Sequence, residues 1–344
     1  MASIVAGHFP GLDVLDGDVA EPNFGICWDQ PPLSGRIDTV WHAAGDTRFS
    51  KGLAAEVMRA NVRGTENALT VARILGARQF HHISTAYVCG EGAASASESL
   101  SVAYGRPRNP YEESKQIAEQ LVVEWGESTG IPWTILRPPI IAGNSVDGFA
   151  CSFTGYYGYM LAWTRLRDSL IRELEDADRA RVLSRSGIQM ANGVLHLPIH
   201  VPGNAQAPLS IVPVDYVIDS MWAVHTSEQR NCSFHLCGAA PKSFGWWLSN
   251  SLRELRIAGV TIGRRESNTG ISRDLLRWER HCKRACKEYL PYISDEPTFL
   301  NSNTRACLEA EPSIDERYLS RILTFATECG FEASRAQHSP KNVT

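Results

Sequence analysis

The sequence predicts an α/β fold in which a parallel sheet is followed by a mostly helical C-terminal lobe. Short apolar segments alternate with helical patterns over the first part of the chain, which is typical of parallel sheets. After Gly148 the pattern changes to an aromatic, glycine-punctuated segment and then to charged helical stretches. The 344 residues, 43 % of them hydrophobic, suffice for one large domain or slightly more.

The sheet region is expected to contain four strands and two helices. Each strand is a short apolar run that ends in small residues, a loop or prolines: 12–18, 38–45, 79–89 and 133–140. Apolar residues at helical spacing predict one helix over 56–75, which Gly76 stops. A second helix over 111–127 begins after Asn109-Pro110, a typical start signal.

The second half of the chain is expected to be mainly helical. A long helix is predicted over 159–183 and a shorter one over 215–225, before a strand over 233–237. The remainder is largely helical to about Phe331, and residues 336–344 form a frayed polar tail.

Composition excludes several functional classes. A net charge of −4 without basic runs argues against nucleic acid as a partner. Nine scattered cysteines predict reduced thiols and a cytoplasmic protein. The longest uncharged stretch, 149–164, is shorter than the ~20 residues of a membrane span. His281-Cys282 and Cys286 resemble half a metal site, and because no second ligand pair stands at suitable spacing, no metal is expected.

Tyr111 and Lys115 are the candidate catalytic pair. They stand four residues apart in the expected helix, so their side chains share one face. A nearby ammonium lowers the pKa of a phenol from its ordinary value near ~10, which allows proton exchange closer to neutral pH. This spacing alone also occurs in surface helices without function.

Further motifs place the pair in a recognisable family. The chain resembles the extended short-chain dehydrogenase/reductase superfamily, nearest to the thioester-reductase and fatty-acyl-CoA-reductase-like branch with its male-sterility type NAD-binding domain. The matching segments follow one another in order: Gly17–Pro22, His42–Gly45, Asn61–Thr65, Ser84–Gly90, Leu136–Ile140 and Ile211–Tyr216. The resemblance implies a Rossmann-like core over 1–148 and substrate-lobe segments over 149–335, interleaved with the last core strands.

The resemblance also assigns roles to individual residues. Tyr111 would be the general acid/base, Lys115 would tune it, Thr85 would hydrogen-bond a substrate carbonyl oxygen, and Asn61 would support the proton relay. The other implied residues belong to a partial cofactor site, with space for a ribose beside the small residues and an adenine facing the aspartate: Ala43, Ala44, Gly45, Asp18 and Pro138.

The start of the chain departs from this family. No G-x-x-G-x-x-G turn precedes Leu12, although such a turn normally holds the pyrophosphate at a helix N-terminus. Gly7 and Gly11 do not replace it, because Pro10 removes a backbone donor and no helical pattern follows. We therefore expect an N-terminally truncated Rossmann-like sheet that binds no dinucleotide in the usual way.

Three functions stay open at this point. The first is a redox-silent cyclase, isomerase, lyase or condensing enzyme of polyketide- or terpenoid-type metabolism, acting on a small apolar carbonyl or acyl substrate. The second is an NADP(H)-dependent reductase of a thioester or aldehyde, with the cofactor region supplied elsewhere. The third is a non-catalytic scaffold. The family also suggests a homodimer formed through the helix that carries Tyr111.

Two groups of residues have alternative interpretations. One of His81 and His82 is expected to be a hydrogen-bonded core residue, and the other to lie on the loop side of its strand. Five aromatic side chains either wall an apolar substrate pocket or form ordinary core: Phe153, Tyr156, Tyr157, Tyr159 and Trp163.

Overall fold

The structure is a computed structural model that describes residues 13–28, 37–100, 104–238, 240–263, 271–294 and 297–333. Its chain divides into two compact units, each made of several segments. The first unit comprises Met1–Gly92, Ser99–Arg137 and Gln229–Phe234. The second comprises Ala93–Glu98, Pro138–Glu228 and His235–Thr344.

A four-stranded sheet forms the centre of the first unit. Its strands lie in the order β1-β2-β4-β11, with the bounds Thr39–His42, Gln79–Ile83, Trp133–Arg137 and Cys232–His235. The pairs β1–β2 and β2–β4 are parallel, and His42 lies in register with His82, which faces Ile135 across the next pair. The strands expected around 38–45, 79–89, 133–140 and 233–237 are confirmed.

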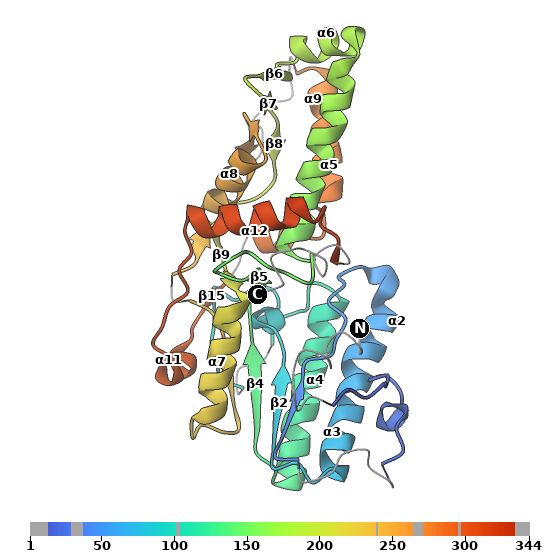
Figure 1. The fold of residues 1–344 in the computed structure, drawn as a ribbon, viewed down its shortest axis with the longest axis vertical. Coiled ribbons are helices and arrows are strands. Elements are labelled where there is room, and N and C mark those ends of the chain that lie inside the picture. Colours follow the sequence, from blue (N-terminus) through green and yellow to red (C-terminus); the bar gives the residue numbers. More distant parts are fainter. Residues whose placement is uncertain are drawn as a thin grey trace. The chain divides into compact units, whose positions relative to one another are not determined.

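Helices of the first unit pack beside this sheet (Figure 1). One continuous helical stretch consists of α2 (Ala54–Met58), the π turn η3 (Arg59–Arg63) and α3 (Gly64–Ile74). The other helix is α4 (Pro110–Thr129). Apolar side chains of α3, α4 and the sheet form one buried cluster, which excludes water from this side of the strands: Ala68, Leu69, Ala72, Ala77, Phe80, Val122, Trp133 and Ile135. The described residues of this unit also form short 3-10 helices: η1 (Pro22–Gly25), η2 (Lys51–Leu53) and η4 (Ala86–Cys89).

The strand expected over 12–18 is wrong for the residues that the structure describes. Residues 13–18 have no strand conformation. Asp18 instead begins a turn, in which its backbone N–H donates to the carbonyl of Phe24 at 3.1 Å. The Asp18 side chain accepts a hydrogen bond from the backbone of Ala20 at 2.9 Å. An apolar run becomes a strand only where a partner strand takes up its backbone groups.

The second unit combines helices with short paired strands. Its helices are α5 (Tyr156–Glu175), α6 (Ala177–Arg185), α7 (Val214–Thr226), α8 (Phe244–Glu254), α9 (Arg273–Ala285), α10 (Leu290–Ser294), α11 (Ser302–Cys307) and α12 (Glu316–Glu328). Its strands are β3 (Ser95–Ala96), β5 (Ile140–Ala142), β6 (Gln189–Ala191), β7 (Val194–His196), β8 (His200–Val201), β9 (Pro208–Leu209), β10 (Ile211–Pro213), β12 (Lys242–Ser243), β13 (Ile257–Ala258), β14 (Thr261–Ile262) and β15 (Thr298–Phe299). They pair as β10–β5, β12–β9, β13–β7–β6, β14–β8 and β15–β3.

The long helix expected over 159–183 is interrupted at Asp176. This residue has extended backbone angles, φ −82° and ψ 121°, and separates α5 from α6. Its carboxylate accepts hydrogen bonds from the backbone of Asp178 at 3.1 Å and of Arg179 at 2.9 Å. Aspartate is a preferred N-cap residue, so the interruption comes from a capping signal that apolar spacing does not reveal.

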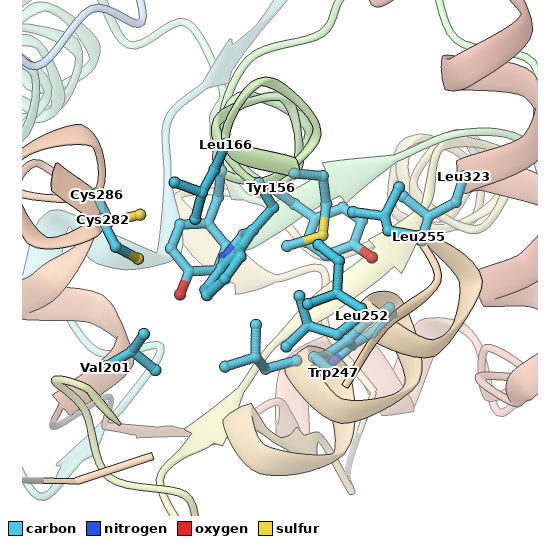
Figure 2. Close-up of a cluster of buried hydrophobic side chains, with 14 of the residues drawn as sticks. Tyr156, Leu166, Val201, Trp247, Leu252, Leu255, Cys282, Cys286 and Leu323 are labelled. Atoms are coloured by element: carbon cyan, nitrogen blue, oxygen red, sulfur yellow. The ribbon is translucent and has the colours of Figure 1, made fainter. Parts of the chain in front are cut away.

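The core of the second unit answers the question about the aromatic residues after Gly148. Tyr156, Tyr157, Tyr159 and Trp163 are at most 5 % exposed and belong to one large apolar cluster. Figure 2 shows Tyr156 and Leu166 among the side chains of this cluster, with Cys282 and Cys286 together at the left of the view. These aromatic residues therefore serve as core of the unit, and they stabilise it by burial of large apolar surfaces.

None of the helices in the described part combines the length and the apolarity that crossing a lipid bilayer requires. The same residues contain no group of three or more metal-ligating side chains. Cys282 and Cys286 are both 3 % exposed and lie in the apolar core.

The buried carboxylate of Glu98 holds the start of α11 through hydrogen bonds. It is 6 % exposed and accepts hydrogen bonds from the backbone N–H of His235 at 2.7 Å and of Asn303 at 2.6 Å. The hydroxyl of Thr304 donates to it at 2.9 Å. Hydrogen bonds to a charged group contribute more than neutral ones, so we expect the charge of Glu98 to matter for folding.

Replacing Glu98 with glutamine is expected to lower the free energy of unfolding by about 1.5–3 kcal/mol. The NH2 group of glutamine is itself a donor, so it would face N–H and hydroxyl donors that now bind the carboxylate. Chemical denaturation of the two proteins measures this difference. The exposed Glu228 offers a matched control, and Glu228→Gln should leave the midpoint unchanged. Equal midpoints for Glu98→Gln and the wild type would contradict the expectation.

Candidate active site

Thr85, Tyr111 and Lys115 meet at the carboxyl end of β2. Thr85 follows β2 and is the N-cap of η4, where its hydroxyl accepts a hydrogen bond from the backbone of Tyr87 at 3.3 Å. The same side chain is hydrogen-bonded to the phenol of Tyr111. Carboxyl ends of parallel strands are the usual place for sites in such sheets, and the predicted grouping of these residues agrees with this position.

The start of α4 holds Tyr111 in place. Asn109 caps the helix by accepting a hydrogen bond from the backbone of Glu112 at 3.0 Å, and Pro110 occupies the first turn. The Glu112 carboxylate reaches back to Arg108, whose guanidinium lies 3.1 Å away and whose backbone N–H donates at 2.8 Å. Because both sides of Tyr111 are bonded in this way, its backbone has little freedom.

Lys115 is buried and points toward the end of β2. Its side chain is 6 % exposed, and Nζ donates to the carbonyl oxygen of Ile83 at 2.8 Å. Burial lowers the pKa of Lys115 from 10.5 to about 8, and the nearby Glu119 opposes this shift. Lys115 therefore carries its positive charge at neutral pH and loses it in mildly alkaline solution.

The pKa of Tyr111 corrects one expectation from the sequence. Burial raises it from 10.0 to about 12, and the hydrogen bond with Thr85 offsets only part of this rise. The prediction that the ammonium brings this pKa toward neutral is wrong, because desolvation is the larger effect. Tyr111 is thus fully protonated at neutral pH, which suits a proton donor better than a base.

Asn61 organises the loop that follows β1. It lies 1 % exposed in the π turn η3, a feature often found at functional sites. Its amide group holds Asp46 twice: Oδ1 accepts from the backbone N–H at 2.6 Å and Nδ2 donates to the carbonyl at 2.9 Å. Nδ2 also donates to the hydroxyl of Ser114 at 2.8 Å. In this structure Asn61 thus links the loop to α4, one turn from Tyr111.

The small residues after β1 leave open backbone beside Lys115. Ala43, Ala44 and Gly45 are all exposed. A Cβ atom placed on Gly45 would lie 3.0 Å from Oδ1 of Asn61 and 3.5 Å from Nζ of Lys115. A side chain here would therefore crowd both functional groups, and this open backbone is compatible with the predicted space for a ribose.

The two other predicted cofactor residues lie elsewhere in the fold. Asp18 is exposed, and its carboxylate lies 3.9 Å from the guanidinium of Arg59. The neighbouring Val19 packs against Gly64 at the start of α3. Pro138 is buried directly after β4 and belongs to the second unit. Their contacts with an adenine and a cofactor stay predictions.

Histidines occupy the two strands that lead to the site: His42 lies on β1, and His81 and His82 lie on β2. His81 is fully buried and hydrogen-bonded to the hydroxyl of Thr134, as expected for one residue of its pair. His82 is also fully buried, so its predicted loop-side position is wrong; neither ring nitrogen has a hydrogen-bond partner in the described part of the chain. Burial, with a smaller effect of Lys115, lowers the pKa of His42 to about 4, so this ring is neutral.

Two residues that the sequence did not single out contribute to the site. The Ser114 hydroxyl donates to the carbonyl of Tyr111 at 2.7 Å and accepts from Asn61. Its place three residues after Tyr111 was an available signal, because residues three apart share a helix face. The ring of Phe49 lies beside Tyr111, and nothing in an irregular loop could have indicated this contact.

A family model for NAD binding, described as "Male sterility protein", matches residues 8–221. Among curated proteins, the chain is 32 % identical over 151 residues to the trifunctional UDP-glucose 4,6-dehydratase/UDP-4-keto-6-deoxy-D-glucose 3,5-epimerase/UDP-4-keto-L-rhamnose-reductase RHM1 of Arabidopsis thaliana. This match covers 41 % of this chain and only 20 % of RHM1, so the relative is much longer than the shared part.

Solved structures share the fold. The terminal R domain from the myxalamid PKS-NRPS biosynthetic pathway superposes with a TM-score of 0.65 at 21 % identity, over 92 % of this chain and 75 % of that domain. RMD from Pseudomonas aeruginosa, solved with NADPH, superposes with a TM-score of 0.56 at 19 % identity, over 94 % and 91 %. Both are Rossmann-type proteins, and the α/β fold with a parallel sheet agrees with the sequence prediction.

The comparisons overturn the expectation that the chain binds no dinucleotide in the usual way. The matching family model is one of NAD binding, and structural neighbours carry NADPH or NAD. The lack of a glycine-rich turn before Leu12 therefore does not exclude a dinucleotide, since the chain matches a family of NAD-binding domains.

Proposed function

Because the chain belongs to the male sterility protein family, in the thioester-reductase-like branch of the extended short-chain dehydrogenases/reductases, we propose that it is an NAD(P)(H)-dependent oxidoreductase of a carbonyl group. The reaction that fits best is reduction of a thioester or aldehyde. The observation that carries the proposal is the grouping of Thr85, Tyr111 and Lys115 beside the open backbone of Gly45.

Thr85 and Tyr111 would hold the oxygen of the substrate carbonyl. Their hydroxyls already meet through a hydrogen bond, so both can turn toward one acceptor. As negative charge grows on that oxygen, Tyr111 donates the proton of its phenol, which its pKa of about 12 keeps in place at neutral pH. Transfer to an alkoxide is downhill, because an alkoxide is the stronger base.

Lys115 would stabilise the charge that passes to Tyr111. Its ammonium is fixed by the Ile83 carbonyl at 2.8 Å and keeps two further N–H groups for other acceptors. Ala43, Ala44 and Gly45 would receive the nicotinamide and its ribose. When bound, the reduced nicotinamide supplies the hydride that adds to the carbonyl carbon, while the proton from Tyr111 adds to the oxygen.

The redox-silent alternatives have less support. Cyclase or lyase chemistry does not require a Thr85, Tyr111 and Lys115 set held as it is here, and the relatives named for their activity carry out dehydration, epimerisation and reduction. A non-catalytic scaffold has no need for a buried ammonium, which desolvation makes costly.

The direct test is a titration of the purified protein with NADPH and, separately, NADH, followed by nicotinamide fluorescence. Saturable binding, with loss of nicotinamide absorbance once octanal is added, is expected. The fluorescence separates binding from turnover. Absence of binding for both dinucleotides would refute the proposal and favour the redox-silent reading.

The activity is expected to fall with increasing pH above about 8, by about tenfold per pH unit, because Lys115 then loses its proton. The pH profile of kcat/KM for octanal reduction measures this limb. In Lys115→Arg the charge persists to much higher pH, so any remaining activity should lack the decline. A wild-type profile that stays level to about pH 10 would contradict the role of the ammonium.

A further inference from the structure

Three consecutive residues of α4 each hold a different part of the candidate site. Ser114 accepts a hydrogen bond from Asn61, which organises the loop after β1. Lys115 donates to the carbonyl of Ile83 at the end of β2. The third residue, Gln116, is half-buried, and its amide donates two hydrogen bonds to backbone carbonyls. A single turn of the helix is thus bonded to three segments around the proton donor.

Gln116 joins two of these segments that are distant in sequence. Its Nε2 donates to the carbonyl of Val88 at 3.0 Å and to the carbonyl of Gly105 at 2.9 Å. An amide NH2 group has two N–H bonds, so both donors are used. Val88 lies in η4, shortly after Thr85, whereas Gly105 lies in the segment before α4. Gln116 therefore links the turn that follows β2 to the segment that leads into the helix of Tyr111.

The backbones of the two segments also contact each other directly. The N–H of Gly105 donates to the carbonyl of Cys89 at 2.7 Å, and the N–H of Glu91 donates to the carbonyl of Arg106 at 2.8 Å. A Cβ atom placed on Gly105 would clash with the carbonyl oxygen of Glu91, so a side chain does not fit between the segments. The two segments form one tightly paired unit, and the amide of Gln116 ties this unit to α4.

A short series of hydrogen bonds leads from Gln116 to the hydroxyl of Thr85. The backbone N–H of Val88 donates to the carbonyl of Thr85 at 3.2 Å. The backbone N–H of Tyr87 donates to the Thr85 hydroxyl at 3.3 Å, and this hydroxyl is bonded to the phenol of Tyr111. A movement of Val88 away from α4 would therefore move η4 and displace the Thr85 hydroxyl.

We propose that Gln116 is a positioning residue, which holds the hydroxyl of Thr85 at the phenol of Tyr111. Donors that are fixed in advance lower the reaction barrier, because they need no rearrangement when charge develops on the carbonyl oxygen. The proposal rests on the proposed function, since it takes that oxygen as the group that both hydroxyls bind. It goes further by giving a role in the reaction to a side chain that acts only through Val88 and Gly105.

The kinetic test replaces Gln116 with methionine, which keeps the length of the side chain and removes both donors. With NADPH and octanal, kcat is expected to fall by about tenfold to a hundredfold, the size of effect that a small displacement of a reacting group produces. Because the loss concerns the transition state, the KM for octanal and the dissociation constant of NADPH should stay within about threefold of the wild type. All assays are run well below the lowest thermal midpoint of the proteins, so that unfolding does not contribute.

Two further variants make this result specific. Gln120→Met is the same substitution one turn later in α4, where the side chain is exposed, and it should leave kcat unchanged. Thr85→Val removes the hydroxyl and should itself lower kcat. The double variant Thr85→Val/Gln116→Met should be no slower than Thr85→Val, because Gln116 acts through that hydroxyl. Losses that multiply in the double variant would show that Gln116 acts by another route and would overturn the proposal.

A spectroscopic measurement tests the same role without turnover. Tyrosine labelled with carbon-13 at Cζ gives one NMR resonance for Tyr111, which its absence in Tyr111→Phe assigns. This resonance should move in Gln116→Met toward its position in Thr85→Val, and it should stay in place in Gln120→Met. A resonance that does not move in Gln116→Met, or a wild-type kcat in this variant, would refute the positioning role. If the resonance moves although no sample consumes NADPH, the reductase assignment fails and the role of Gln116 stands.

Discussion

Replacing Tyr111 with phenylalanine is expected to lower kcat for carbonyl reduction by about 10²–10⁴-fold, the usual contribution of a positioned proton donor. The substitution removes one hydroxyl and its hydrogen bond with Thr85, and leaves the ring contact with Phe49 in place. Steady-state kinetics with NADPH and octanal measures the effect. The thermal midpoint should change little.

Thr85→Ser is the matched control for this experiment. Serine keeps the hydroxyl that bonds to Tyr111 and the cap on the backbone of Tyr87, so activity should fall only modestly. Full activity in Tyr111→Phe would remove proton transfer from the mechanism and would favour the scaffold or a template that needs no acid.

The second large effect is expected at a buried ion pair between α4 and β4. Arg137 is 2 % exposed and Glu119 is fully buried; Nη2 of Arg137 lies 2.6 Å from Oε2 of Glu119 and Nε lies 2.9 Å from Oε1. The hydroxyl of Tyr104 also donates to this carboxylate. Arg137→Met would leave a buried charge without its partner, and we expect a loss of about 3–5 kcal/mol in the free energy of unfolding.

A double substitution separates the pair from its surroundings. Arg137→Met combined with Glu119→Leu removes both charges, and such apolar replacements of buried pairs are often neutral or stabilising. The double variant should thus be more stable than Arg137→Met in urea denaturation. If the double variant lost as much stability as the two single variants together, packing rather than the unpaired charge would determine the loss.

The sequence was sufficient to predict that Thr85, Tyr111 and Lys115 lie together, but not to predict their electrostatics. Tyr111 and Lys115 could be paired because a helix fixes residues four apart, and Thr85 could be added because its strand ends at the same edge. The pKa of Tyr111 could not be predicted, because burial depends on side chains distant in sequence. The contact of Phe49 with Tyr111 could not be predicted, because an irregular loop has no side-chain periodicity that would indicate where a ring points.

The fold, too, could be predicted from the sequence only in part. Strands β1, β2 and β4 follow from apolar runs that neighbouring strands can pair with. The prediction of a strand over 12–18 is wrong because an apolar run alone does not specify a partner strand. The prediction of one helix over 159–183 is wrong because Asp176 caps a new helix, and the spacing of apolar residues does not show this. Local chemistry decided both places.

The π turn at Arg59–Arg63 has a consequence for how this site can change over evolutionary time. A π turn holds one more residue than the α-helical turn that it replaces. Loss of a single codon here would restore a regular α-helical turn, while α2 and α3 kept nearly the same relation to each other. The contacts of Asn61 with Asp46 and Ser114 start from within this wide turn, so they would change even with Thr85, Tyr111 and Lys115 all intact. A search for inactive descendants should therefore compare the length of this segment as well as the identity of the catalytic residues.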